Sequence, residues 1–93
     1  MMTITLDGRD MTSIEETHKL LKHALLLSDY YGENLDALWD ELSTKSRPMS
    51  IKITHTDDMD RTLGAYSEKL KELFREIGMY NKGISVEFKD DDQ

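Results

Sequence analysis

The chain has 93 residues, and its 19 acidic against 12 basic side chains give a formal net charge of −7. This acidic excess disfavours nucleic acids and anionic membranes as partners, and it favours a basic protein or a cation. Because the sequence contains no cysteine, it can form neither a disulfide nor a thiolate metal site. A solvated acidic surface that keeps a small protein soluble is the plainer interpretation of the same charge.

The N-terminal segment carries no sign of export. Met1-Met2-Thr3-Ile4 lacks the basic segment and long apolar run of a signal peptide, and no window approaches the apolar length of a membrane span. No internal repeat or linker divides the sequence. We therefore expect a cytoplasmic protein that forms one domain over residues 1–93.

The first third of the chain predicts a strand and then a helix. Residues 2–6 alternate between apolar and polar side chains, which indicates a half-buried strand, and Asp7-Gly8 predicts a turn. Ser13 and Glu16 have the spacing of a capping box at a helix start. Apolar residues then recur at helical intervals, so the helix is expected to continue to about Leu27.

The stretch DYYGENLDALWD, residues 29–40, is the most distinctive part of the sequence. Asn34 is a typical cap for a short helix, which carries the only tryptophan, Trp39, at the edge of its apolar side. At about 100° per residue, three leucines fall on one side of this helix and two aspartates on another: Leu35, Leu38 and Leu42, against Asp36 and Asp40. Like charges four residues apart destabilise a helix by about 0.2–0.5 kcal/mol. Folding alone gives no reason for this pattern, whereas a cationic partner would give one.

The last half of the chain predicts two further strands and the longest helix. Pro48 is acceptable at the first position of a strand, and residues 49–53 alternate as a strand does. Residues 56–60 are acidic and polar, and they predict at most a short helical turn. A helical pattern follows over residues 66–77, and residues 84–88 alternate again as a third strand.

This element order predicts an α/β fold. Connections that contain helices imply parallel strands, and such crossovers are right-handed. The three strands alternate instead of being continuously apolar, so only one face of the sheet should be covered. Crossovers of one hand that keep every helix on one face must advance in one direction. We therefore predict a two-layer sandwich, in which a three-stranded parallel sheet of order 1-2-3 has helices packed on one face and polar residues on the other.

The eleven residues from Tyr30 to Asp40, YYGENLDALWD, closely resemble the signature of the barstar family, the intracellular inhibitors of barnase-type secreted ribonucleases. Phe74-Arg75-Glu76 also resembles the family's motif in its last helix, and the rest of the chain agrees in element order and length. The resemblance implies a folded inhibitor that plugs the active site of a small basic ribonuclease with the second helix and the loop before it. By motif position, the residues that would contact the enzyme are Tyr30, Asn34, Leu35, Asp36, Trp39 and Asp40.

The resemblance also implies roles for single acidic residues. Asp40 would take the place of the RNA phosphate and accept charged hydrogen bonds from the enzyme, Asp36 would face further cations, and Glu76 would add a peripheral ion pair. The sequence departs from the family's best-known member in residues 41–48, ELSTKSRP, because this segment lacks that member's glycine-tryptophan pair and the acidic residue that accompanies the pair there. Lys45 and Arg47 place positive charge in that segment instead, which leaves the enzyme partner open.

These residues also allow other interpretations. Trp39 could be a core residue, and one of Tyr30 and Tyr31 is expected to close the core while the other faces solvent. Asp36 and Asp40 could form a catalytic acid/base pair or bind a cation, but a lone pair at this spacing is weak evidence. The three histidines are expected to be structural or surface residues. His18 and His23 are five residues apart, outside the four-residue spacing of a two-histidine metal site, and His55 is isolated.

The leading hypothesis is therefore a ribonuclease inhibitor with no enzymatic activity, no metal and no cofactor. Its partner would be a basic ribonuclease of the extracellular type, and it would bind neither nucleic acid nor a membrane. The free protein would be a monomer. The alternative is an acidic adaptor or antitoxin that uses the same surface to bind a different basic protein. An enzyme that uses Asp36 and Asp40 is the third and weakest hypothesis.

Overall fold

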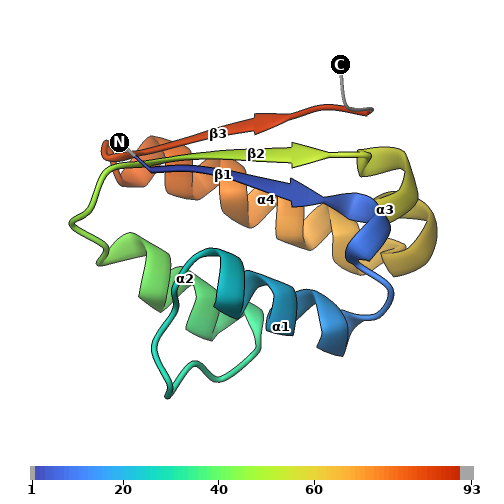
Figure 1. The fold of residues 1–93 in the computed structure, drawn as a ribbon, viewed down its shortest axis with the longest axis horizontal. Helices are drawn as coiled ribbons and strands as arrows, with labels where there is room; N and C mark the ends of the chain where they lie inside the picture. Colours follow the sequence, from blue (N-terminus) through green and yellow to red (C-terminus); the bar gives the residue numbers. More distant parts are fainter. Residues whose placement is uncertain (1, 91–93) are drawn as a thin grey trace.

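A three-stranded parallel sheet forms one layer of the molecule (Figure 1). The computed structural model describes residues 2–90. Strands β1 (Met2–Asp7), β2 (Met49–Thr54) and β3 (Ile84–Phe88) lie in the order β1-β2-β3. Met2 pairs with Met49, and Met49 pairs with Ile84. The predicted parallel sheet and its strand order are thus confirmed.

Helices cover one face of this sheet. α1 (Ile14–Ala24), α2 (Leu35–Ser43) and α4 (Ala65–Tyr80) lie on the same side of the strands, and α3 (Thr56–Leu63) lies at the end of β2 (Figure 1). The opposite face of the sheet carries polar side chains, of which Thr3, Thr5, Ser85 and Glu87 are exposed. The prediction of one covered face and one polar face is therefore also confirmed.

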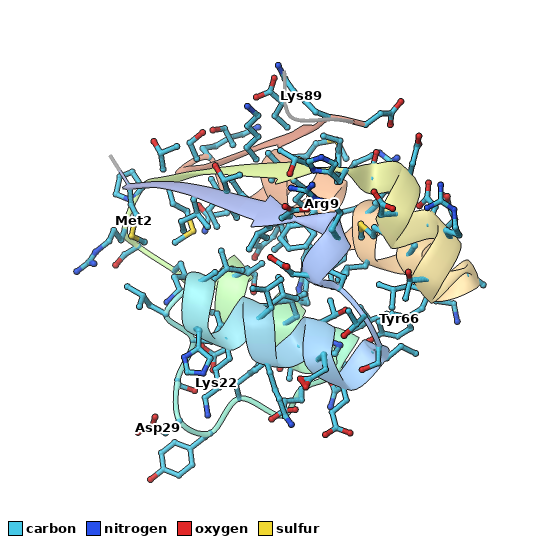
Figure 2. The ribbon with its side chains drawn as sticks, turned by 45° about the vertical axis from the view of Figure 1, so that its right-hand side comes forward. Met2, Arg9, Lys22, Asp29, Tyr66 and Lys89 are labelled. Atoms are coloured by element: carbon cyan, nitrogen blue, oxygen red, sulfur yellow. The ribbon has the colours of Figure 1, made fainter. Side chains whose placement is uncertain are left out.

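The core lies between the sheet and these helices, where side chains from both layers meet (Figure 2). Alternate strand residues supply its upper half: Ile4, Leu6, Met49, Ile51, Ile53 and Ile84. One stripe of each helix supplies the lower half: Leu21, Leu38, Leu42, Leu70, Leu73, Phe74 and Ile77. The two periodicities of the sequence, two in strands and 3.6 in helices, therefore face the same interior.

Helix α1 ends at Ala24, three residues before the position expected from the sequence. Leu26 adopts a left-handed conformation with φ 54°, and the Leu27 N–H donates to the Lys22 carbonyl at 3.0 Å. This is the usual way in which a left-handed residue closes a helix. Leu25 and Leu27 are nevertheless buried in the core. The apolar pattern in the sequence therefore extends past the last residue of the helix, which is why the helix was predicted to be longer.

The sequence predicts at most a short helical turn at residues 56–60. The structure instead has a helix of eight residues there, so the prediction was too short. The start of α3 lacks the usual sequence signal, since His55 precedes it with φ 52° and provides no side-chain cap. Asp60 attaches the helix to α4, because its Oδ1 lies 2.8 Å from Lys71 Nζ and accepts a hydrogen bond from Ser67 Oγ at 2.6 Å.

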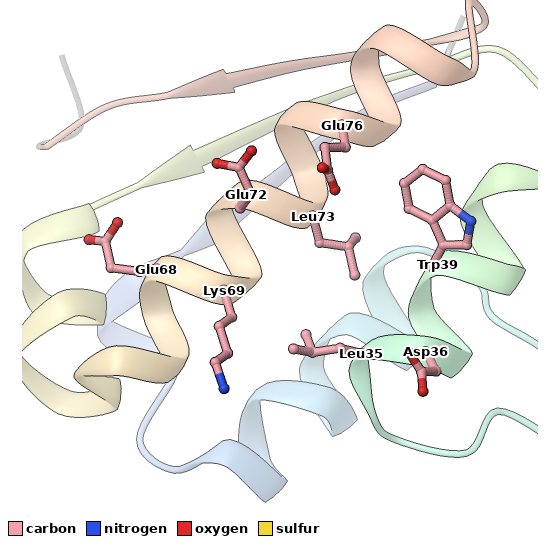
Figure 3. Close-up of a pocket in the computed structure, with 8 residues that line it drawn as sticks. All are labelled: Leu35, Asp36, Trp39, Glu68, Lys69, Glu72, Leu73 and Glu76. Carbon is pink, nitrogen blue, oxygen red and sulfur yellow. The ribbon is translucent and has the colours of Figure 1, made fainter.

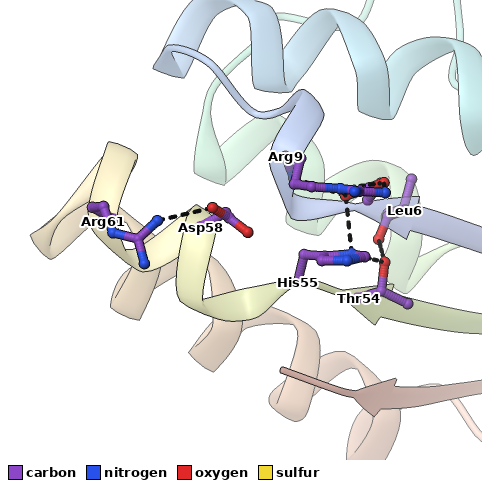
Figure 4. Close-up of polar contacts among 7 residues, drawn as sticks. Leu6, Arg9, Thr54, His55, Asp58 and Arg61 are labelled. Carbon is purple, nitrogen blue, oxygen red and sulfur yellow. Dashed lines mark hydrogen bonds and ion pairs between the residues drawn. The ribbon is translucent and has the colours of Figure 1, made fainter. Parts of the chain in front are cut away.

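The chain passes very close to itself where β1 ends. A Cβ atom on Gly8 would lie 2.2 Å from the His55 carbonyl oxygen, so only glycine fits this position. Beside it, Arg9 donates to both oxygens of Asp7, and His55 Nδ1 lies 3.2 Å from Asp7 Oδ1 (Figure 4). The Arg9 hydrogen bond lowers the pKa of Asp7 from its usual value. This cluster fixes the exits of β1 and β2 at the end of the sheet next to α3.

Candidate functional site

Helix α2 is held at both ends by asparagine side chains. At its start, Asn34 Oδ1 accepts from the Ala37 N–H at 2.8 Å, and Asn34 Nδ2 donates to the Gly32 carbonyl at 3.2 Å. At its end, Asn81 Nδ2 donates to the carbonyls of Leu42 and Lys45 at 3.0 and 2.9 Å. Free N–H and C=O groups at helix ends need such partners. The position of α2 is therefore fixed by local capping at one end and by the turn after α4 at the other.

The loop before α2 is anchored through Tyr31. Its hydroxyl lies 2.5 Å from Nδ1 of the buried His18, and His18 Nε2 lies 2.6 Å from the hydroxyl of Tyr66 on α4. Burial lowers the pKa of His18, an effect that the charge of Glu33 partly opposes, and it raises the pKa of both tyrosines. The neighbouring Tyr30 is 95% exposed. The prediction that one tyrosine closes the core and the other faces solvent is confirmed.

A second attachment joins the same loop to the side of α2. The Glu41 carboxylate accepts hydrogen bonds from Ser28 Oγ and Ser28 N at 2.5 and 3.2 Å, which lowers the pKa of Glu41. One turn later, Lys45 Nζ donates to the Leu26 carbonyl at 3.1 Å. Lys45 thus helps to hold the loop after α1, a role that its position in the sequence did not indicate. Glu41 and Lys45 together attach the loop between α1 and α2 to the side of α2. Asp29 labels the outer part of this loop in Figure 2.

The two aspartates of α2 are exposed on its outer side, as their spacing predicted. Within residues 2–90, neither the Asp36 nor the Asp40 carboxylate forms an ion pair or a hydrogen bond. Trp39 lies between them in sequence and is half-buried, so it is neither a full core residue nor a fully exposed one. Its ring packs against Tyr80 with a centroid distance of 5.4 Å.

A groove of about 500 Å³ runs between α2 and α4 (Figure 3). Four of the predicted site residues line it: Leu35, Asp36, Trp39 and Glu76. Leu73 adds to its apolar floor, and Lys69 is the one cation among the described residues that line it. The structure therefore brings Glu76 of α4 to the same groove as the predicted residues of α2.

A smaller hollow of about 280 Å³ lies on the other side of α2. Tyr30 and Asp40 line it, together with Tyr31, Gly32 and Ala37. The predicted residues are thus divided between two hollows on either side of α2, and Asn34 lines neither but caps the start of the helix. Because Asp36 and Asp40 line different hollows, neither hollow encloses both carboxylates, which argues against their acting as an acid/base pair.

Sequence reasoning missed three residues at this surface. Tyr80 and Lys69 belong to α4, and the available signal was their spacing of four and seven residues from Glu76. Glu41 lies directly after the motif and showed no sign of binding Ser28. In the described part of the chain, no group of three or more potential ligands could hold a metal ion. Over the same residues, no helix is both long and apolar enough to cross a membrane.

Comparisons with known proteins identify the family of this chain. The family model described as Barstar (barnase inhibitor) matches residues 1–90. The chain is also 39% identical over 77 residues to the Bacillus subtilis (strain 168) protein named "Putative ribonuclease inhibitor YrdF", an alignment that covers 82% of this chain and 85% of that protein. Both the description of the family and the name of the relative refer to inhibition of a ribonuclease. The chain belongs to the barstar family.

Proposed function

We propose that this protein inhibits a small, basic, secreted ribonuclease of the barnase type by covering its active site with α2 and the loop before it. One observation on the outer side of α2 carries the proposal. Asp36 and Asp40 are exposed there and form no ion pair among residues 2–90, although the helix that bears them is fixed at both ends. A rigid display of unpaired carboxylates suits a cationic active site better than it suits the stability of the free protein.

In this proposal Asp40 replaces a phosphate group of the RNA. An enzyme that cleaves RNA must bind phosphate through cationic side chains, and a carboxylate can accept the same charged hydrogen bonds. Arginine offers two parallel N–H donors to such a carboxylate. Asp40 is exposed in the free protein, so its desolvation takes place only when the enzyme supplies those donors. No covalent step is needed, because the inhibitor simply occupies the site.

The other predicted residues would surround this contact. Asp36 and Glu76 would meet further cations from the groove side, while Leu35 and Trp39 would supply apolar contact area. Tyr30, fully exposed beside Asp40, would lie against the enzyme from the loop side. Asn34 would hold the first turn of α2 in place, since its amide already bonds Ala37 and Gly32.

Charge would also favour rapid binding. A protein with a net charge of −7 attracts a basic partner before contact, and salt screens this attraction over a Debye length of about 8 Å at physiological ionic strength. We propose that the free protein is a cytoplasmic monomer, which protects the producing cell from its own ribonuclease. Its complex with the enzyme would then contain one copy of each chain.

Replacement of Asp40 by alanine tests the proposal. Calorimetric titration against a panel of basic guanyl-specific ribonucleases that includes barnase, with RNA cleavage measured in parallel, should show tight one-to-one binding and loss of cleavage. Asp40→Ala should weaken that binding at least about 100-fold, because a cation of the enzyme would be left buried without its partner, at a cost of about 3–5 kcal/mol.

The matched control is Asp57→Ala, which removes the same charge from an exposed position on α3. It should leave the dissociation constant within about twofold. Both variants should unfold within a few degrees of the parent protein, since the charges they remove change helix stability by less than about 1 kcal/mol. Equal affinity of Asp40→Ala and the parent would contradict the binding mode. Absence of binding to every ribonuclease of the panel would favour the adaptor or antitoxin hypothesis instead.

A further inference from the structure

One stripe of α4, from Lys69 to Tyr80, lies beside α2. Lys69, Leu73 and Glu76 line the groove, and Tyr80 follows one turn after Glu76 as the last residue of the helix. The spacing of four, three and four residues keeps these side chains on one face of a helix. The proposed binding surface on α2 therefore continues on α4 as far as Tyr80, which no sequence motif had indicated.

Tyr80 is the exposed member of an aromatic pair that it forms with the half-buried Trp39. Their ring centroids are 5.4 Å apart and their planes are inclined by 50°. Tyr80 nevertheless remains 66% exposed, so its contact with Trp39 leaves most of its surface in water. Aromatic side chains with this much free surface are typical anchors of protein interfaces, since they offer a large rigid area with few rotatable bonds.

The chemistry next to the pair indicates what it would bind. Asp36 and Glu76 share the groove with Trp39, and within residues 2–90 neither carboxylate takes part in an ion pair. A flat guanidinium group can stack on aromatic rings while it donates hydrogen bonds to carboxylates. Lysine forms the same cation–aromatic contact less well, because its ammonium is compact and strongly hydrated.

We propose that Tyr80 is a specificity-determining contact, and that it forms with Trp39 a platform on which an arginine side chain of the ribonuclease stacks. This inference rests on the proposed function, and it extends the binding surface from α2 to the C-terminal end of α4. The competing explanation is that Tyr80 only shields the half-buried Trp39 from water. In that case Tyr80 would affect the stability of the free protein and not its affinity for the enzyme.

Two substitutions at Tyr80 separate these explanations, with Met79 as the matched control. Met79 is the adjacent residue and is also 66% exposed, but it lines a different hollow, toward β3. Against barnase, Tyr80→Ala should raise the dissociation constant about tenfold, and Tyr80→Phe, which keeps the ring, should stay within about twofold. Met79→Ala should also stay within about twofold, and all these variants should keep the unfolding temperature of the parent.

The cationic character of the occupant is tested by adding charge. Tyr80→Lys should weaken binding at least tenfold more than Tyr80→Ala at low salt, because the new ammonium group would repel the arginine. Met79→Lys makes the same change in net charge one residue away, so it measures the general electrostatic effect. The effect of Met79→Lys is subtracted from that of Tyr80→Lys. If the remaining loss of affinity is no greater than that of Tyr80→Ala, an arginine does not stack on Tyr80.

The experiment distinguishes failure of this inference from failure of the proposed function. If Asp40→Ala abolishes binding but Tyr80→Ala behaves as Met79→Ala does, the platform is wrong and the inhibitor proposal stands. If Tyr80→Ala lowers the unfolding temperature and leaves affinity unchanged, Tyr80 is only a cover for Trp39. If barnase does not bind, the barnase-type target is wrong, and if it binds Asp40→Ala as well as the parent, the proposed binding mode is wrong; the platform is overturned in both cases.

Discussion

At the scale of single residues, His18 is central to the shape of the binding loop. A neutral imidazole has one donor and one acceptor nitrogen, so it can satisfy one tyrosine hydroxyl as donor and the other as acceptor. Tyr31 and Tyr66 occupy those two positions. A protonated imidazole would carry two donors and a charge in a buried site, which burial disfavours. The neutral form of His18 therefore holds Tyr31, and with it the loop that precedes α2.

The stability of the protein should fall as the pH falls below about 6.5, the ordinary pKa of histidine. Burial lowers the pKa of His18, so below that pH the unfolded chain binds its proton more readily than the folded chain does. Stability is then complete above the unfolded pKa and decreases toward the folded one, with a slope of at most about 1.4 kcal/mol per pH unit for one proton. Urea unfolding between pH 5 and pH 8 measures this slope.

Glutamine at position 18 is the test for the origin of the effect. His18→Gln keeps one donor and one acceptor but cannot be protonated, so its stability should depend less on pH in this range. His23→Gln, an exposed histidine of the same helix, should retain the slope of the parent. An unchanged slope in His18→Gln would show that another group binds the proton.

At the scale of elements, the sequence was sufficient wherever the signals were local. Ser13 and Asn34 both cap helices as expected, with side chains that accept from Glu16 N and Ala37 N. The ends that were predicted wrongly or left vague depend on Leu26 and His55, which adopt left-handed conformations that glycine or asparagine usually signals. Tertiary packing imposes those conformations, and a single sequence does not record it.

The candidate site shows the same division between local and tertiary information. Its α2 residues follow from one continuous motif, and Glu76 from a short one. The contact of Trp39 with Tyr80 joins residues that are distant in sequence, and it depends on how α2 packs against α4. No periodicity or motif in the sequence specifies that packing. The sequence could therefore supply the members of the α2 surface and Glu76 on α4, but not the contact that extends this surface to Tyr80.

Asn81 should be the most important single residue for the C-terminal end of α2. Asn81→Ala leaves the Lys45 carbonyl without its side-chain donor and leaves the Leu42 carbonyl with only backbone N–H donors such as that of Lys45, so we expect a loss of about 1–3 kcal/mol of stability, measured by urea unfolding. Asn81→Asp has nearly the same shape and keeps the oxygen that accepts from Gly83 N, but it lacks the donor. It should therefore lose at least as much stability. Full stability of Asn81→Asp would mean that these two bonds do not hold the helix.

At the scale of the whole molecule, charge is arranged unevenly around the groove between α2 and α4. Asp36 and Glu76 lie toward Trp39, while Lys69 lies two helical turns before Glu76 on α4 (Figure 3). Among the described residues Lys69 forms no ion pair, so its positive charge adds nothing evident to the stability of the fold. If the partner is basic, this lysine opposes the attraction that the net charge of −7 provides.

Reversing that charge should speed the encounter with the enzyme. Lys69→Glu should raise the association rate constant for barnase several-fold at low ionic strength, because it strengthens the acidic field at the groove where the enzyme is proposed to bind. Lys82→Glu makes the same change on the β3 side, where Lys82 lines a separate hollow, and it should have a smaller effect. Stopped-flow association kinetics at increasing salt measure both, and the two rates should converge near 1 M, where the Debye length is about 3 Å. Equal acceleration by the two variants would place the groove outside the interface, because net charge alone would then account for the whole effect.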